Sequence, residues 1–117
     1  INSNRSKGTK FFQELRASGN ADTYSYNVMI DFSSSEDALL LKKEMESSGV
    51  PLSGASWNSI VKALVNDGLF REAEEMLDQM QEEGFEPSPR TIKPLVGALK
   101  RVGKRQIAKN IRDRFLQ

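Results

Sequence analysis

The chain has 117 residues and contains neither cysteine nor histidine. Without cysteine it can form no disulfide framework and no thiolate metal site, and without histidine it lacks the commonest general base and metal ligand. No apolar run approaches the roughly 18 residues of a membrane span. The glycines mark expected helix ends and do not form a phosphate-binding loop. The sequence therefore gives no support for an enzyme, a cofactor site or a metal site.

The formal net charge of +1 conceals a strongly uneven distribution. Residues 23–88 contain 4 Lys or Arg against 13 Asp or Glu, whereas residues 89–117 contain 9 against 1. Most of the acidic residues fall in two segments, 36–46 and 72–83. The apolar pattern predicts that the chain is built from pairs of helices and that each of these segments is the second helix of its pair. We therefore expect the first helix of each pair to present few carboxylates, and the basic end of the chain to attract polyanions.

Residues 56–88 have the pattern of two helices joined by a tight turn. Apolar residues recur at the spacing of one helical face in 57–64 and again in 73–80. Ser56 is the expected N-cap of the first helix, and the Asn-Asp-Gly turn at 66–68 is expected to end it. The residues predicted to form the buried face are Trp57, Ile60, Val61, Leu64, Ala73, Met76, Leu77 and Met80.

This pair of helices recurs along the chain with a period of 35 residues. A shift by that period superposes Ala38 on Ala73 and Ala108, and Gly49 on Gly84. One repeat is shorter by about one helical turn of roughly four residues, so its apolar face is preserved. We divide the chain into a partial repeat that supplies only a second helix (1–22), two repeats (23–53 and 54–88) and a truncated C-terminal repeat (89–117).

The first helices of the repeats are aligned by small polar residues. Ser25, Ser56 and Thr91 occupy equivalent positions and are each expected to be an N-cap. In the first helix of the C-terminal repeat, Pro94 then falls in the third position, where its missing amide group needs no intrahelical partner.

The two ends of the chain are expected to differ. Residues 1–7 are polar and aperiodic, so we expect them to be poorly ordered or weakly helical, while residues 8–18 are expected to form a short amphipathic helix. The chain begins at Ile1, which is expected of a processed or trimmed piece. The open N-terminal end is expected to expose apolar surface, for upstream repeats, a partner or self-association.

Four segments carry a resemblance to a known family: TYSYNVMID (23–31), ASWNSIVKAL (55–64), GLFREAEEMLDQMQEEGFEPS (68–88) and GKRQIAKNI (103–111). Together they resemble the pentatricopeptide repeat family, with one short repeat and one repeat of standard length. The resemblance implies an all-α solenoid of antiparallel helix-turn-helix repeats with a right-handed superhelical course. It also implies a non-enzymatic protein that needs no cofactor and binds single-stranded RNA in a chloroplast or mitochondrion, where it acts in RNA processing, splicing, stability or translation.

The resemblance also assigns roles to individual residues. The family's base-reading positions fall on Asn27 with Ser53 and on Asn58 with Ser88, a combination that implies a preference for pyrimidine, cytosine first. In the third repeat Lys93 holds this position, and a lysine suggests contact with phosphate rather than choice of base. Further positions expected to contact the RNA backbone or to stack on a base are Tyr24, Arg90, Lys100 and Arg101.

Simpler interpretations stay open beside these. Asn27 and Asn58 can be interpreted as solvated residues in the first turn of a helix. The basic residues of 100–114 can be interpreted as the polar outer face that a terminal repeat needs. Trp57 is expected in the core rather than as a stacking platform. The alternative function is a protein-interaction scaffold within a larger organellar assembly, such as a ribosome or an RNA polymerase. It is favoured by the acidic middle of the chain.

Overall fold

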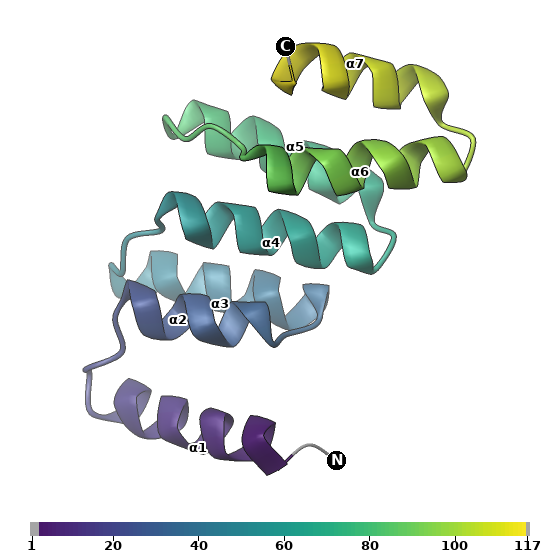
Figure 1. Cartoon of the computed structure of the whole chain (residues 1–117). Helices are drawn as coiled ribbons and strands as arrows, with labels where there is room; N and C mark the ends of the chain where they lie inside the picture. The colour runs from purple at the N-terminus through teal and green to yellow at the C-terminus, as the bar shows by residue number, and fades with distance from the viewer. Residues whose placement is uncertain (1–2, 117) are drawn as a thin grey trace.

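The computed structural model describes residues 3–116, with side chains from Lys10 onward. This part of the chain is built from helices without any strand (Figure 1). The helices are α1 (Ser3–Ala17), α2 (Thr23–Asp31), α3 (Ser35–Ser48), α4 (Gly54–Asn66), α5 (Phe70–Glu82), α6 (Pro89–Arg101) and α7 (Arg105–Phe115). None of the described helices is both long enough and apolar enough to cross a membrane.

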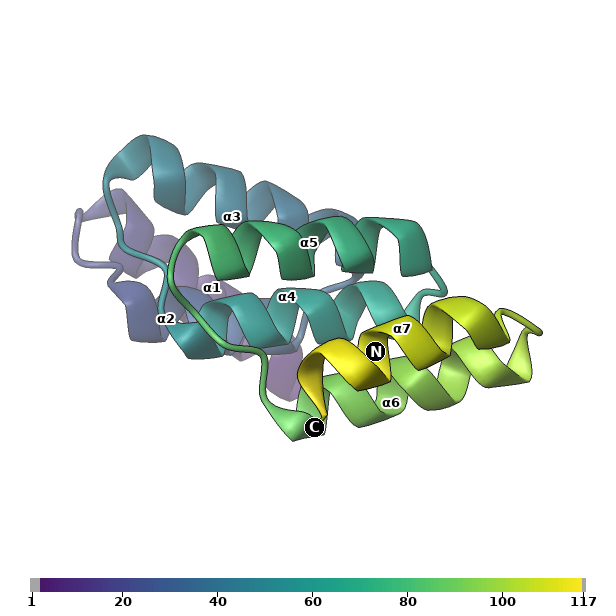
Figure 2. The ribbon, with the colours of Figure 1, turned by 90° about the horizontal axis from the view of Figure 1, so that it is seen from above.

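The helices stack as successive hairpins. The first helices α2, α4 and α6 lie side by side in one layer, and α2 contacts α4 as α4 contacts α6 (Figure 1). Their partners α3 and α5 lie in a second layer behind them, and α7 pairs with α6 (Figure 2). The stack measures 47 × 34 × 18 Å, the elongated shape expected when each repeat touches only its neighbours. This is an all-α repeat solenoid.

The first helices begin three residues earlier than the sequence analysis predicts. Their N-caps are Asp22, Ser53 and Ser88, each with extended backbone, whereas Ser25, Ser56 and Thr91 are the third helical residues. The prediction of Ser25, Ser56 and Thr91 as caps was wrong because the apolar stripe shows only where a helix becomes buried. The first turn is partly exposed and leaves no periodic signal.

Pro94 is accordingly deeper in α6 than the sequence analysis predicts. It is the sixth residue of the helix, not the third, and Pro89 occupies the first position. Proline at the first position is favourable, whereas Pro94 removes the amide group that would bond the Arg90 carbonyl. Its ring is exposed, so α6 continues past it with one main-chain bond missing.

The helix ends follow the predicted turn chemistry. Asn66 is the last residue of α4, Asp67 is its C-cap, and Gly68 adopts a left-handed φ of 74°. Left-handed backbone costs a side chain free energy that glycine avoids. The Gly68 amide donates to the Val65 carbonyl at 3.0 Å, which ends the helix and turns the chain toward α5.

The buried face is the one that the helical pattern predicts. Trp57 is 3% exposed, and Met76 and Met80 are buried in the same core. The Lys42 ammonium lies 5.1 Å from the centre of the Trp57 ring. The residues buried in the core of the two central hairpins include Ile60, Val61, Leu64, Ala73 and Leu77.

Helix α1 covers the N-terminal end of the stack. It begins at Ser3, earlier than the amphipathic segment predicted for 8–18, and residues 1–2 of the predicted weakly ordered segment lie outside the described residues. Phe12 is buried and packs edge-to-face on Tyr26, with ring centroids 5.0 Å apart. The Arg16 guanidinium holds Glu44 of α3 through two hydrogen bonds of 2.7 Å.

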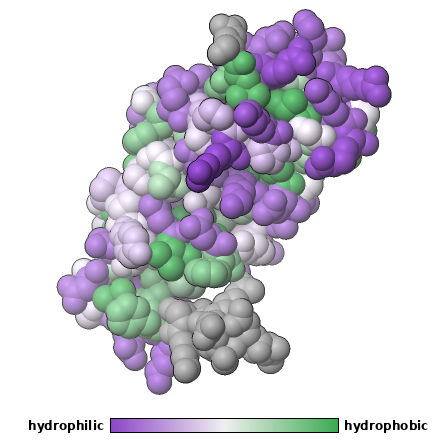
Figure 3. All heavy atoms as spheres, viewed as in Figure 1, coloured by the Kyte–Doolittle hydropathy of each residue, from purple (hydrophilic) through white to green (hydrophobic). Residues whose placement is uncertain are grey.

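The N-terminal end is nevertheless only partly covered. Because α2 has 9 residues where α4 has 13, a cleft of about 380 Å³ with a mixed polar and apolar lining remains between α1 and the α2–α3 hairpin. Phe11, Phe32 and Leu40 are each at least 60% exposed. In Figure 3 hydrophobic surface is visible toward this end, whereas the opposite end is mostly hydrophilic.

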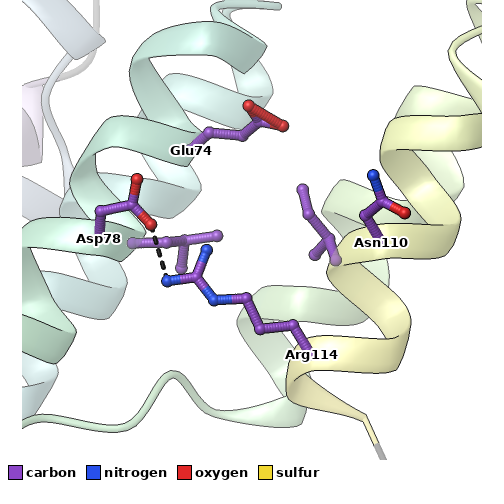
Figure 4. A pocket seen from close by; sticks show the side chains of 6 residues that line it. Glu74, Asp78, Asn110 and Arg114 are labelled. Carbon is purple, nitrogen blue, oxygen red and sulfur yellow. Dashed lines mark ion pairs between the residues drawn. The ribbon is translucent and has the colours of Figure 1, made fainter.

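Polar groups connect the C-terminal hairpin to its neighbour in addition to the buried core. Arg114 of α7 reaches α5, where its guanidinium lies 2.7 Å from Asp78 (Figure 4). The same guanidinium also donates to Gln81. Between α5 and α7 lies a shallow cleft of about 120 Å³, with Glu74 and Asn110 on opposite sides. The ion pair is half-exposed, so it orients α7 more than it stabilises the fold.

Candidate nucleic-acid interface

The first junction between repeats is built around Asn27. Asn27 is the fifth residue of α2, and its side chain turns toward the start of α4. Its Nδ2 donates to Ser53 Oγ at 3.1 Å, and its Oδ1 accepts from Ser56 Oγ at 2.5 Å. The predicted pair of Asn27 and Ser53 is therefore in direct contact, half-buried on the edge of the first-helix layer.

The second junction repeats this arrangement one step along the stack. Asn58 is the fifth residue of α4, and its Oδ1 accepts from the Ser88 amide at 3.1 Å and from Thr91 Oγ1 at 2.7 Å. Its Nδ2 donates to the Gly54 carbonyl at 2.8 Å. Asn58 and Ser88 are again adjacent and half-buried. Each asparagine thus connects the start of one first helix to the start of the next.

The hydroxyl groups of Ser56 and Thr91 are components of these junctions that the sequence analysis missed. Both residues are buried, and both donate to the asparagine of the preceding repeat. The signal was present in the sequence, since each follows an N-cap serine by three residues, as in a capping box. Interpreting them as caps concealed that their hydroxyl groups face the neighbouring helix.

The other predicted positions lie on the first helices or at their ends. Tyr24 is the second residue of α2 and is 75% exposed, so its ring is accessible to a base. Arg90 is the second residue of α6, and Lys93 takes the place that Asn27 and Asn58 hold in the helices before it. Lys100 and Arg101 close the same helix. All four basic residues are exposed.

The first-helix layer is poor in acid. Helices α4 and α6 contain no Asp or Glu, and α2 contains only Asp31. Lys62, which the sequence analysis did not single out, is exposed one turn beyond Asn58. With the basic residues of α6 it extends the positive surface across two repeats.

The acidic residues lie mostly in the second layer or at helix ends. Asp22 caps α2, and the hydrogen bonds it accepts from the backbone and hydroxyl of Ser25 lower the pKa of its carboxyl. Asp67 accepts from the Ser35 amide at 2.8 Å, and bonds from the Ser35 hydroxyl and backbone lower its pKa in the same way. Among the described residues no acidic cluster could hold a metal ion. These carboxylates hold helix ends in place.

The stacked hairpins define an α-solenoid. Its first helices form an acid-poor layer and are bridged by asparagines. Comparison with known proteins narrows the class of solenoid further. The PPR repeat family model matches residues 55–85, the α4–α5 hairpin. The chain also matches the crystal structure of the pentatricopeptide repeat protein PPR10 from maize with a TM-score of 0.81 and 25% identity, over 96% of this chain and 17% of that one. A search of curated proteins gives no match.

The family-model match to the α4–α5 hairpin and the structural match over the stack both support assignment to the pentatricopeptide repeat family, as the four sequence segments suggested. The chain spans about a sixth of the length of the maize protein. Neither match indicates a catalytic family.

Proposed function

We propose that the chain binds single-stranded RNA along the first-helix layer and acts in organellar RNA processing, splicing, stability or translation. Capture is electrostatic through α4 and α6, and bases are read at Asn27 with Ser53 and at Asn58 with Ser88. Tyr24 supplies a stacking surface, and Arg90, Lys93, Lys100 and Arg101 contact the backbone. We propose a chloroplast or a mitochondrion as the compartment, on the strength of the family alone.

One observation carries this proposal. Two neighbouring first helices, α4 and α6, contain no acidic residue, and their exposed cations accompany the half-buried amide group of Asn58. Cations without neighbouring carboxylates attract phosphate, and an amide group beside them offers hydrogen bonds to a base edge. A helical-repeat protein reads about one base per repeat through two or three side chains, so two junctions specify about two bases.

A salt titration of RNA binding tests the electrostatic part. Each phosphate contact on a single strand contributes about 0.7 to the slope of log K against log salt, so Lys93→Gln is expected to lower that slope by about 0.7. Lys43→Gln removes the same charge from α3 in the second layer and is the matched control. Equal effects of the two substitutions would show that net charge, not the first-helix layer, determines binding.

The second candidate is a protein-interaction scaffold in a larger assembly. It is supported by the exposed apolar side chains at the N-terminal end, Phe11, Phe32 and Leu40. Self-association or a complex through this end is compatible with RNA binding on α4 and α6, which are further along the stack. Absent or salt-independent RNA binding in the titration would favour the scaffold and contradict the RNA proposal.

A further inference from the structure

Asn27 and Asn58 are equivalent in the repeat, but their hydrogen-bond partners differ. We propose that Asn58 is fixed as a hydrogen-bond donor toward a base, whereas Asn27 can present either a donor or an acceptor. Asn58 therefore distinguishes cytosine from uracil, and Asn27 accepts both. This inference rests on the proposed function, because it assumes that bases meet these two amide groups.

The orientation of the Asn58 amide is determined by main-chain groups. Its Oδ1 lies 3.1 Å from the Ser88 N–H, which can only donate, and its Nδ2 lies 2.8 Å from the Gly54 carbonyl, which can only accept. Turning the amide over would set donor against donor and acceptor against acceptor, and would leave half-buried polar groups unpaired. The side chain therefore has one favourable orientation.

The remaining hydrogen-bonding capacity of Asn58 is a single N–H group. Oδ1 has two lone pairs, and the Ser88 amide and the Thr91 hydroxyl at 2.7 Å occupy both. Nδ2 has two hydrogen atoms, and the Gly54 carbonyl takes one. No other residue in the described part of the chain accepts the second hydrogen. A ligand at this amide meets a donor.

Asn27 has partners of another kind. Its Nδ2 and Oδ1 face Ser53 Oγ and Ser56 Oγ, and a hydroxyl group can either donate or accept. The Asn27 amide can therefore turn over and keep both hydrogen bonds. In either orientation one lone pair and one hydrogen atom remain for a ligand.

The two junctions differ because α4 and α6 are capped differently. At α4 the Ser53 N–H donates to Ser56 Oγ at 2.9 Å in a capping box, so Asn27 is left with hydroxyl groups. At α6 the Ser88 side chain makes no capping bond to the backbone, and the Ser88 N–H donates to Asn58 instead. The way in which one first helix is capped thus determines which hydrogen-bonding groups the asparagine of the preceding first helix presents.

This difference has a consequence for base choice. Cytosine presents two adjacent acceptors, O2 and N3, so a lone N–H donor finds a partner along that edge. In uracil N3 carries a hydrogen and only O2 and O4 accept, so discrimination requires the Asn58 N–H to lie opposite N3, where cytosine accepts and uracil repels the donor. A reader that keeps both a donor and an acceptor satisfies either base.

The experiment measures the ratio of dissociation constants for oligo(U) and oligo(C) of equal length. We use the full chain, Asn27→Ala and Asn58→Ala. The full chain and Asn27→Ala, which keeps the selective reader, are expected to favour oligo(C) by about fivefold or more, the discrimination of one good polar contact. Asn58→Ala is expected to bring the ratio within about twofold of one. Equal loss of preference in the two variants would overturn the inference.

A second variant keeps the test decisive, because Asn58→Ala leaves the Ser88 amide and the Thr91 hydroxyl unpaired. Asn58→Asp keeps an oxygen for these donors and replaces the amide nitrogen by an acceptor, which also removes the bond to the Gly54 carbonyl. Affinity for both oligonucleotides is therefore expected to fall, while the preference shifts toward oligo(U). A retained preference for oligo(C) would overturn the inference. If the full chain binds neither oligonucleotide, the proposed function itself has failed; if it binds both equally, only the inference has.

Discussion

Glu44 joins three helices through one carboxylate. It lies on α3 and accepts two hydrogen bonds from Arg16 of α1 and one of 2.6 Å from the Tyr26 hydroxyl of α2. Burial raises the pKa of Glu44, but the bonds from Tyr26 and Arg16 outweigh it, so its pKa lies below the ordinary value of 4.5. Burial, and then Glu44 itself, raises the pKa of Tyr26. The ionised carboxylate is therefore the form that holds the N-terminal end together.

Glu44→Gln is expected to lower the free energy of unfolding by about 1–2 kcal/mol at pH 7, because it removes the charge from these hydrogen bonds. A pKa that folding lowers contributes stability above pH 4.5, and that contribution is lost as the pH falls through the folded-state value. The difference between variant and parent should thus shrink below pH 4, as measured by urea unfolding. Glu46→Gln, which removes an exposed partner of Lys42, is the control and is expected to change little at either pH.

Helix α6 contains two prolines in different roles. Pro89 is its first residue, where the chain has no intrahelical hydrogen bond to lose, and Pro94 is its sixth. A proline inside a helix also sets its ring against the carbonyl group four residues before it. The free energy that Pro94 costs is supplied by burial of the opposite face, in which Ile92, Leu95 and Leu99 are 0% exposed.

Pro94→Ala is expected to raise the free energy of unfolding by about 1–3 kcal/mol, since it restores a main-chain hydrogen bond at an exposed position. Pro89→Ala is the matched control and is expected to leave stability unchanged or slightly lower. Thermal unfolding followed by circular dichroism measures both. An unchanged or lower midpoint for Pro94→Ala would show that the interior proline causes no strain.

The whole molecule is a linear stack whose middle is better supported than its ends. Helix α4 contacts α2, α3, α5 and α6, whereas at the two ends α7 packs mainly on α6 and α1 packs mainly, and less extensively, on α2. In such an array local stability follows from the number of neighbouring elements rather than from a single shared core. Because α1 has the least extensive packing and lies beside the cleft, the α1 end is the weakest part of the described stack.

Hydrogen exchange is expected to show this order. Amide groups of α4 should exchange slowest, through unfolding of the whole stack, and those of α1 fastest, with opening free energies lower by several kcal/mol. Mass-spectrometric exchange over a time course gives the protection of each helix. Uniform protection across α1 to α7 would instead indicate a single cooperative unit.

The asparagine junctions show where sequence reasoning stops. The repeat register placed Asn27 and Asn58 at equivalent positions, and the structure sets both beside the following N-cap. The repeat register could not predict that Ser56 and Thr91 would donate to these asparagines. A hydroxyl group three residues after an N-cap can bond either the backbone or a neighbouring helix. Which partner it takes depends on the distance between two helices. Their roles in base reading stay predictions.

The sequence by itself determined the helices, their pairing and the separation of acidic from acid-poor layers, because helical periodicity and turn residues act over a few positions along the chain. It misplaced the first turns and Pro94, because an exposed turn carries no apolar period. Only the tertiary structure decided the cleft beside the shortened α2, the Arg16–Glu44–Tyr26 contact and the different partners of Asn27 and Asn58. These depend on how far apart neighbouring helices lie, and that distance follows from the packing of side chains distant in sequence.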